Sequence, residues 1–303
     1  LNSGIYVRNS GTGSSSITNS GSIVVEGVNG IGMQVIADGA GTAANATSTG
    51  TITVAGGADP SSGTRNFGVW VEGDEGGAAT SDISGSVTLT GVGAIGVHAR
   101  GNADVTVEDS ATVVFASGTN QIGYFIYGPD AKVAVLRNDL EVNTERSTLF
   151  RIADGAVFDG SGYTLTASGK DSVGVLGTGV GTSIETKGST FYLTGEGANA
   201  VTVEGGAIGT IDSATAIHLD AANTVAGIAD GQKHDIYGNA VGDPDATTKL
   251  TNAAALTSTQ AGVTGLIARN TATVENSGVV TFSGAGSTGL LAETGGPGTN
   301  TPK

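Results

Sequence analysis

A short phrase with the pattern apolar–Gly–apolar–X–apolar recurs along the whole chain and limits what the chain can fold into. Its clearest copy is Ile95-Gly96-Val97-His98-Ala99. Eleven copies occur, a few of them degenerate, and their second residues lie 24 to 39 positions apart. A unit repeated at such a period is typical of a solenoid, in which each repeat packs mainly against its neighbours.

Each repeat holds two further stretches of alternating apolar and polar residues. One follows a turn, as in Asn19-Ser20-Gly21-Ser22-Ile23, and a shorter one often precedes it, as in Val105-Thr106-Val107. Alternation at a period of two predicts strands, and the Gly, Asn, Asp and Ser residues between them predict turns. No stretch keeps a helical period. The sequence therefore predicts an all-β fold, a single parallel β-helix of about eleven rungs over residues 1–294, with three short strands per rung and a triangular cross-section. Residues 295–303 resemble a linker.

The charge balance narrows the range of partners. The chain has 28 acidic and 13 basic residues and a net charge of −15. Binding to nucleic acid or to anionic lipid needs a basic surface, so neither partner is expected. No apolar run approaches the roughly 18 residues of a membrane helix, and no direct membrane insertion is expected. The absence of cysteine weakly favours a bacterial or cytosolic origin.

The X position of the phrase should form a column. The apolar residues on either side of X are expected to point inward, so X points outward, and parallel rungs stack X on X. The first six X residues are Tyr6, Gln34, Trp70, His98, Phe125 and Arg151. Large rings with one Arg suit a sugar or a protein hot spot. We expect these six residues to bind a ligand or partner. Alternatively, an adjacent loop or domain covers this face, or a slip of one residue in register reverses which residues point outward.

Two repeats are longer than the others. The extra residues lie within 56–66 and 233–249. Insertions in a solenoid leave the core and become loops on its side, where they are either tolerated surface segments or functional ones.

Signals of catalysis are few. The chain has no Cys nucleophile and no Gly-X-Ser-X-Gly motif. His98, His218 and His234 lack the spacing of zinc ligands and are expected to be ordinary strand or loop residues. Enzymes that cleave sugars cluster carboxylates on one face, and the nearest candidates, which are weak, are Asp159, Lys170 and Asp171. We expect no enzymatic activity.

No cofactor is expected, and calcium is a weak possibility. Two loops supply carboxylate oxygens, one through Asp74 and Glu75 and the other through Asp243 and Asp245. Neither matches an EF-hand or the glycine-rich nonapeptide that binds calcium in some β-solenoids, and solvated loops are the simpler interpretation.

The recurring motifs and the composition of the chain resemble those of a known class of protein. The chain has recurrent turns such as Asn276-Ser277-Gly278-Val279-Val280, Gly-Val-X-Val strands, an excess of acidic residues and no Cys. In these features it looks like the passenger domains of bacterial autotransporters of type V secretion. The likeness is to the pertactin-like and self-associating adhesin branch, and it covers nearly the whole chain.

This resemblance implies a right-handed β-helix displayed on the outer membrane of a Gram-negative bacterium. It implies adhesion to host glycans or extracellular-matrix protein, cell aggregation or biofilm formation, and no cofactor. Three hypotheses remain open: an adhesin that binds along the column, a structural protein that self-associates through polar ladders, and a β-helix enzyme acting on carbohydrate. A localised aromatic groove would favour the first, polar ladders over many rungs the second, and close carboxylates in a cleft the third.

Overall fold

The computed structural model describes residues 2–59 and 64–293, and all of them are in strands, turns or irregular segments, with no helix. The chain divides into two compact units, Leu1–Asn138 and Asp139–Lys303. The tail 295–303 and residues 60–63 of the first insertion lie outside the described residues. Each unit is a stack of parallel three-stranded turns, so the predicted all-β fold is confirmed.

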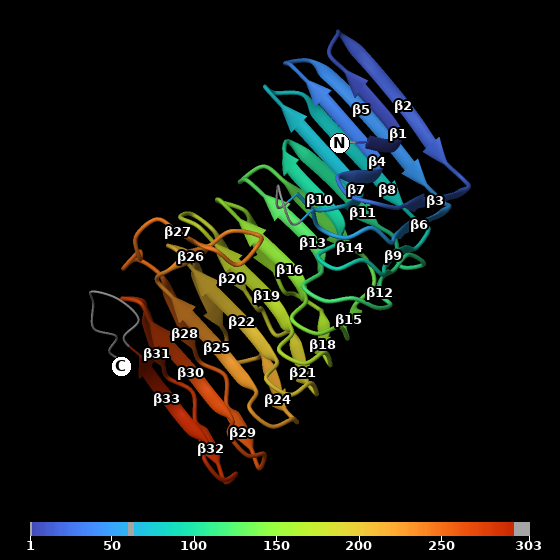
Figure 1. Ribbon diagram of the computed structural model, residues 1–303. Coiled ribbons are helices and arrows are strands. Elements are labelled where there is room, and N and C mark those ends of the chain that lie inside the picture. The colour runs from blue at the N-terminus through green and yellow to red at the C-terminus, as the bar shows by residue number, and fades with distance from the viewer. Residues whose placement is uncertain (1, 60–63, 294–303) are drawn as a thin grey trace. The chain divides into compact units, whose positions relative to one another are not determined.

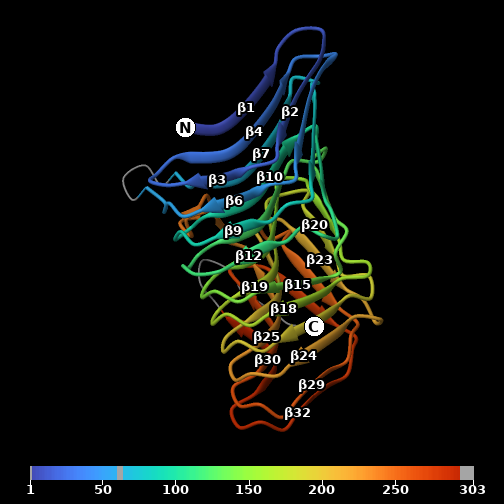
Figure 2. The same ribbon diagram turned by 90° about the vertical axis from the view of Figure 1, so that its right-hand side faces the viewer.

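The N-terminal unit has three parallel sheets. Its first sheet contains the phrase strands β1 (Asn2–Asn9), β4 (Gly30–Asp38), β7 (Phe67–Asp74), β10 (Ile95–Gly101) and β13 (Ile122–Tyr127). Its second sheet contains β2 (Gly13–Asn19), β5 (Thr42–Ser48), β8 (Ala78–Ile83), β11 (Ala103–Val107) and β14 (Lys132–Val135). Its third sheet contains β3 (Ser22–Val25), β6 (Thr51–Val54), β9 (Val87–Leu89) and β12 (Val113–Phe115), which lie one below another in Figure 2.

The C-terminal unit repeats this pattern. Its first sheet contains β16 (Thr148–Ala153), β19 (Val173–Thr178), β22 (Asn199–Glu204), β25 (Val225–Asp230), β30 (Thr264–Arg269) and β33 (Thr288–Glu293), shown from green to red in Figure 1. Its second sheet contains β17 (Val157–Asp159), β20 (Ser183–Glu185), β23 (Ile208–Ile211), β28 (Lys249–Asn252) and β31 (Thr273–Asn276). Its third sheet contains β15 (Asp139–Val142), β18 (Thr164–Ala167), β21 (Thr190–Leu193), β24 (Ala216–Leu219), β29 (Leu256–Ser258) and β32 (Val280–Phe282).

Among the described residues, the phrase strands number five in the first unit and six in the second, so the predicted count of about eleven rungs is confirmed. Each rung has three strands except the last described one, which contributes β33 alone. The architecture is a parallel β-solenoid and is consistent with a right-handed coil.

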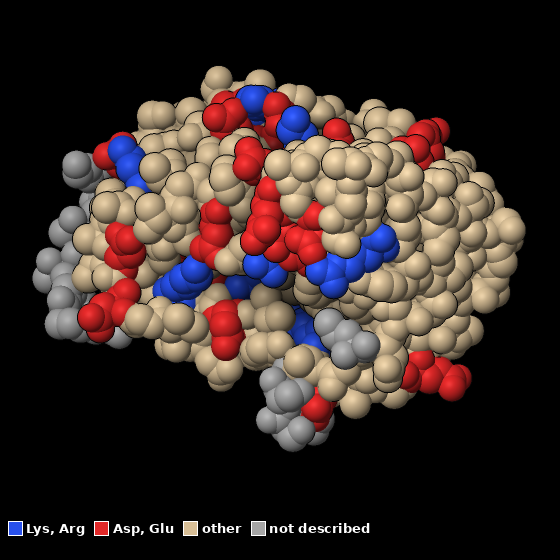
Figure 3. All heavy atoms as spheres, turned by 90° about the horizontal axis from the view of Figure 1, so that it is seen from above, with Lys and Arg blue, Asp and Glu red and all other residues tan. Residues whose placement is uncertain are grey.

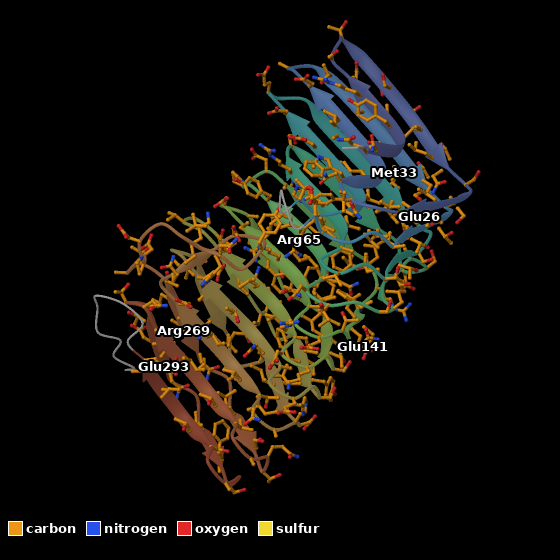
Figure 4. All side chains as sticks on the ribbon, viewed as in Figure 1. Glu26, Met33, Arg65, Glu141, Arg269 and Glu293 are labelled. Atoms are coloured by element: carbon orange, nitrogen blue, oxygen red, sulfur yellow. The ribbon has the colours of Figure 1, made fainter. Side chains whose placement is uncertain are left out.

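The core consists of inward residues stacked in register from turn to turn. Met33 faces Val69, Val69 faces Val97, and Val97 faces Tyr124, with each side chain at most 1% exposed. Figure 4 labels Met33 on β4. A single turn has no second layer to cover these side chains, so their burial depends on the turns above and below.

The glycine of the phrase is required by space. A Cβ on Gly68 would lie 2.7 Å from the Gly96 carbonyl oxygen and 2.6 Å from Cγ1 of Val87. A side chain at this position would clash with the backbone of the next rung and with a core side chain of the third sheet, and this explains why the phrase keeps glycine at its second position.

The first insertion is anchored at its C-terminal end by two buried polar side chains. Arg65, labelled in Figure 4, donates from Nη1 to the carbonyl oxygen of Asn120 at 2.7 Å. Asn66 donates to the Gly27 carbonyl oxygen at 2.8 Å and accepts from the Gly30 backbone N–H at 2.6 Å. The residue before the phrase strand thus fixes where that strand begins.

Candidate ligand-binding face

The predicted column exists in the N-terminal unit. Strand register places Tyr6 beside Gln34, Gln34 beside Trp70, Trp70 beside His98, and His98 beside Phe125. The stacking of these five side chains is therefore confirmed. Arg151, the sixth predicted residue, lies on β16 in the C-terminal unit, where it is in register with Leu176.

The expected exposure of the column is wrong for three of the six residues. Tyr6 is 47% exposed and Gln34 and Trp70 are partly exposed, but His98, Phe125 and Arg151 are 4%, 7% and 7% exposed. Part of the cover comes from the first residue of the phrase. The ring of Phe67 lies 4.6 Å from that of Trp70 and 5.6 Å from that of His98. Outward rings thus pack into a second apolar layer on the sheet.

His98 is a neutral member of this layer. Its ring lies 4.6 Å from Trp70 and 4.7 Å from Phe125 between centroids, and its Nδ1 is 3.1 Å from the Phe125 carbonyl oxygen. Burial lowers the pKa of His98 to about 4, so the ring is uncharged near neutral pH. The carbonyl oxygen can only accept, so Nδ1 carries the proton and donates it. His98 therefore supports its neighbours and offers no cation to a ligand.

A second outward file, two residues further along each strand, completes the accessible surface. Glu72 is in register with Arg100, and Arg100 with Tyr127. Trp70 Nε1 donates to Glu72 Oε2 at 3.0 Å, and Arg100 Nη1 lies 3.4 Å from Glu72 Oε1. The guanidinium carbon of Arg100 is 5.6 Å from the centre of the Tyr127 ring.

We define the binding face as six accessible members of the two files, which are Tyr6, Gln34, Trp70, Glu72, Arg100 and Tyr127. The sequence signal for the second file, a large or charged residue two places after X, was present but was not used in the prediction.

In the C-terminal unit, Arg151 lies under the second insertion. The insertion forms an antiparallel hairpin of β26 (Lys233–His234) and β27 (Ala240–Val241). Arg151 Nη2 donates to the His234 carbonyl oxygen at 2.8 Å and lies 3.8 Å from Glu204 Oε1. Burial lowers the pKa of Arg151, while Glu204, Asp235 and Asp154 oppose that shift. Arg151 therefore holds this hairpin. The prediction that its side chain is exposed is wrong.

Charged contacts fix the hairpin at further points. His234 Nδ1 is 2.9 Å from Glu204 Oε2, and the backbone N–H of His234 donates to Glu204 Oε1 at 3.2 Å. Lys233 Nζ is 2.7 Å from Asp154 Oδ1. On the surface shown in Figure 3, acidic and basic side chains lie close together and do not form separate fields of one sign. We call Arg151, Asp154, Glu204, Lys233 and His234 the hairpin latch.

The latch predicts that the hairpin docks more tightly at low pH. The hydrogen bond with Glu204 raises the pKa of His234, and the negative charges of Glu204 and Asp230 raise it further. Burial and the positive charge of Arg269 lower it, but the net shift is upward. A group whose pKa is higher in the folded than in the unfolded state stabilises the folded state fully at pH values below its unfolded-state pKa. This stabilisation is lost as the pH rises through the folded-state pKa. Hydrogen exchange of the hairpin amides, corrected for intrinsic rates, should therefore show greater protection at pH 5.5 than at pH 8.5.

The control for this prediction is His234→Gln, which keeps a polar side chain without the titration. Its hairpin protection should vary with pH less than that of the parent. Equal pH dependence in both proteins would contradict the role given to His234.

Two acids of the weaker predicted sites, Asp159 and Asp245, have partners within the C-terminal unit. Among residues 2–59 and 64–293, no group of three or more His, Cys, Asp or Glu side chains could hold a metal ion. Asp245, a predicted calcium ligand, instead accepts from Thr247, which lowers its pKa. Asp159 forms an ion pair with Lys187 at 2.6 Å, and its pKa falls to about 2. A general acid needs a raised pKa, so Asp159 does not have the property that a sugar-cleaving acid requires.

No protein-family model, no curated protein and no solved structure matches this chain. Across the described ranges, no helix has the length and apolar character needed to cross a bilayer.

Proposed function

We propose that the chain is an adhesion module displayed on a cell surface, which contacts its ligand through the binding face of the N-terminal unit. The observation that carries the proposal is the group of Trp70, Glu72, Arg100 and Tyr127 in the binding face. Their rings and charged groups share one accessible sheet surface. A rigid sheet presents such groups at little cost in conformational entropy. Host glycans and matrix proteins are the proposed ligand classes.

The setting proposed for this module is the outer surface of a Gram-negative bacterium. The support is the resemblance to autotransporter passenger domains, together with a β-solenoid that has the same architecture. One fold can host many functions, so the proposed ligand binding is argued from the binding face itself.

Two substitutions test the binding face. Trp70→Ala and Arg100→Ala should each weaken attachment of the purified protein to its best target in a glycan and matrix-protein array by about ten-fold, since central aromatic and Arg side chains supply about 1–2 kcal/mol each. Unfolding temperature should change little in Arg100→Ala, because that side chain is exposed. It should fall in Trp70→Ala without loss of the fold, because the ring packs on Phe67 and His98 but is itself partly exposed. Phe125→Ala does not serve here, because that ring is 7% exposed and its loss would lower stability.

The matched control is Tyr237→Ala, which removes a ring that is 42% exposed on the hairpin of the other unit. Its binding should equal that of the parent. Full binding by both Trp70→Ala and Arg100→Ala would refute the proposal.

One observation favours a second function, self-association. On the second sheet of the N-terminal unit, Asn45 Nδ2 donates to Ser14 Oγ at 2.8 Å, and Thr80 Oγ1 donates to Asn45 Oδ1 at 2.8 Å. This polar ladder across three turns offers the same groups to an identical surface. Sedimentation velocity separates the two functions: dimers that form with rising concentration and are lost in Thr80→Lys would support self-association.

A further inference from the structure

Two stacked rings lie on the third sheet of the C-terminal unit, away from both surfaces described above. Tyr192 on β21 and His218 on β24 are in register. Their ring centroids are 4.5 Å apart with an interplanar angle of 8°, and both side chains are exposed. Parallel strands are spaced by ~4.8 Å, so the two rings follow the rungs, each lying flat against the next.

The next place in this file has no ring. His218 is in register with Thr257 on β29, and Thr257 with Thr281 on β32. Both threonines are exposed. One face of His218 is covered by Tyr192, so the other turns toward Thr257. A flat molecule resting above Thr257 would continue the stack at an ordinary stacking distance.

A polar groove adjoins this place. It has a volume of about 350 Å³, and its lining includes Asp220, Thr257, Ser258, Gln260 and Thr281. Ser258 Oγ donates to the Leu219 carbonyl oxygen at 2.8 Å and accepts from the Gln260 backbone N–H at 3.1 Å. These bonds hold the groove wall in place. The exposed Asp220 carboxylate and the hydroxyl groups are available to accept or donate hydrogen bonds.

We propose that this ring slot, defined by Tyr192, His218, Thr257 and Asp220, binds one pyranose ring of a glycan. A pyranose has an apolar C–H face that packs on an aromatic ring and a rim of hydroxyl groups that need polar partners. The slot offers an aromatic face on one side and a polar groove at its edge, which is the usual composition of a site for a small polar ligand. The inference goes beyond the proposed function, since it names a second site and its ligand class on the other unit.

The experiment uses the whole chain and four methyl glycosides: those of galactose, mannose, N-acetylglucosamine and glucuronic acid. Saturation-transfer difference NMR detects which of them binds, and titration gives its affinity. Thr257→Trp fills the slot with a ring supplied by the protein and should abolish the binding. Thr166→Trp is the matched control, since Thr166 is in register with Tyr192 on its opposite side. That variant should bind within two-fold of the parent.

His218→Ala and Asp220→Ala dissect the slot, and they decide the question if Thr257→Trp does not fold. Each should weaken glycoside binding by about ten-fold, while Tyr237→Ala, which removes an exposed ring outside the slot, should leave it unchanged. The binding face is tested separately by Trp70→Ala and Arg100→Ala in the array, so either proposal can fail alone. The proposal is overturned if no glycoside binds the parent protein, or if binding survives His218→Ala and Asp220→Ala.

Discussion

Val97→Asp is expected to destabilise the N-terminal unit by about 4 kcal/mol or more, enough to unfold a marginally stable protein near room temperature. Val97 is fully buried and lies between Val69 and Tyr124 in the stacked core. An unpaired carboxylate at that position loses its hydration without gaining a partner. Its pKa would rise until the group is neutral, and burial of the acid would still cost free energy in addition to the lost apolar contact.

Thermal and denaturant unfolding followed by circular dichroism measure this effect, and two variants calibrate it. Val97→Ala removes two methyl groups without adding polarity and should cost about 2 kcal/mol. Val24→Asp places the same carboxylate on an exposed strand position, beside Thr53, and should change stability by less than about 0.5 kcal/mol. If Val97→Asp were as stable as Val24→Asp, the register of the phrase would be shifted by one residue.

The repeat predicted the architecture because its signal is distributed over the chain. The position of Val97 directly before an outward X residue appears in every clear copy of the phrase, and a parallel coil places equivalent residues on one another. Inward residues could therefore be assigned without knowing the rest of the molecule.

Exposure of the outward residues could not be predicted in the same way. His98 points away from the core yet is 4% exposed, in part because Phe67, three residues before Trp70, folds onto the same surface. Burial of Arg151 depends on a hairpin more than 80 residues later, which packs on β16 through the carbonyl oxygen of His234. Such contacts join residues that the repeat does not relate to one another.

The ring slot was missed for a related reason. In the sequence, His218 is a single histidine without the spacing of a zinc ligand, and Tyr192 lies 26 positions before it. Only the register between β21 and β24 brings the two rings together. Alignment of the third strand of each repeat, and not of the phrase alone, would have placed Tyr192, His218 and Thr257 in one file.

Glu204→Ala is expected to release the hairpin without unfolding the solenoid. Glu204 is 5% exposed and is the shared partner of Arg151 and His234. Removal of one member of a buried charge pair costs about 3–5 kcal/mol where the other charge must stay buried. Here the hairpin can lift and let water reach Arg151, so the loss is limited to the free energy of hairpin docking. The hairpin amides should exchange at least about a hundred-fold faster, while core amides of β22 and β25 keep their protection.

Hydrogen exchange resolves the two regions, and chymotrypsin cleavage after Tyr237 gives an independent signal of hairpin release. Glu204→Gln is the matched control, because it keeps the size and hydrogen-bonding capacity of the side chain but leaves the charge of Arg151 without that partner. It should show a smaller release of the hairpin. It should also lose most of the pH dependence, because Glu204 is the main cause of the raised pKa of His234. A global fall in protection that includes β22 would mean that the hairpin and the solenoid form one cooperative unit. Unchanged exchange in Glu204→Ala would mean that the remaining contacts, Lys233 with Asp154 and Arg151 with the His234 carbonyl oxygen, are enough to hold the hairpin.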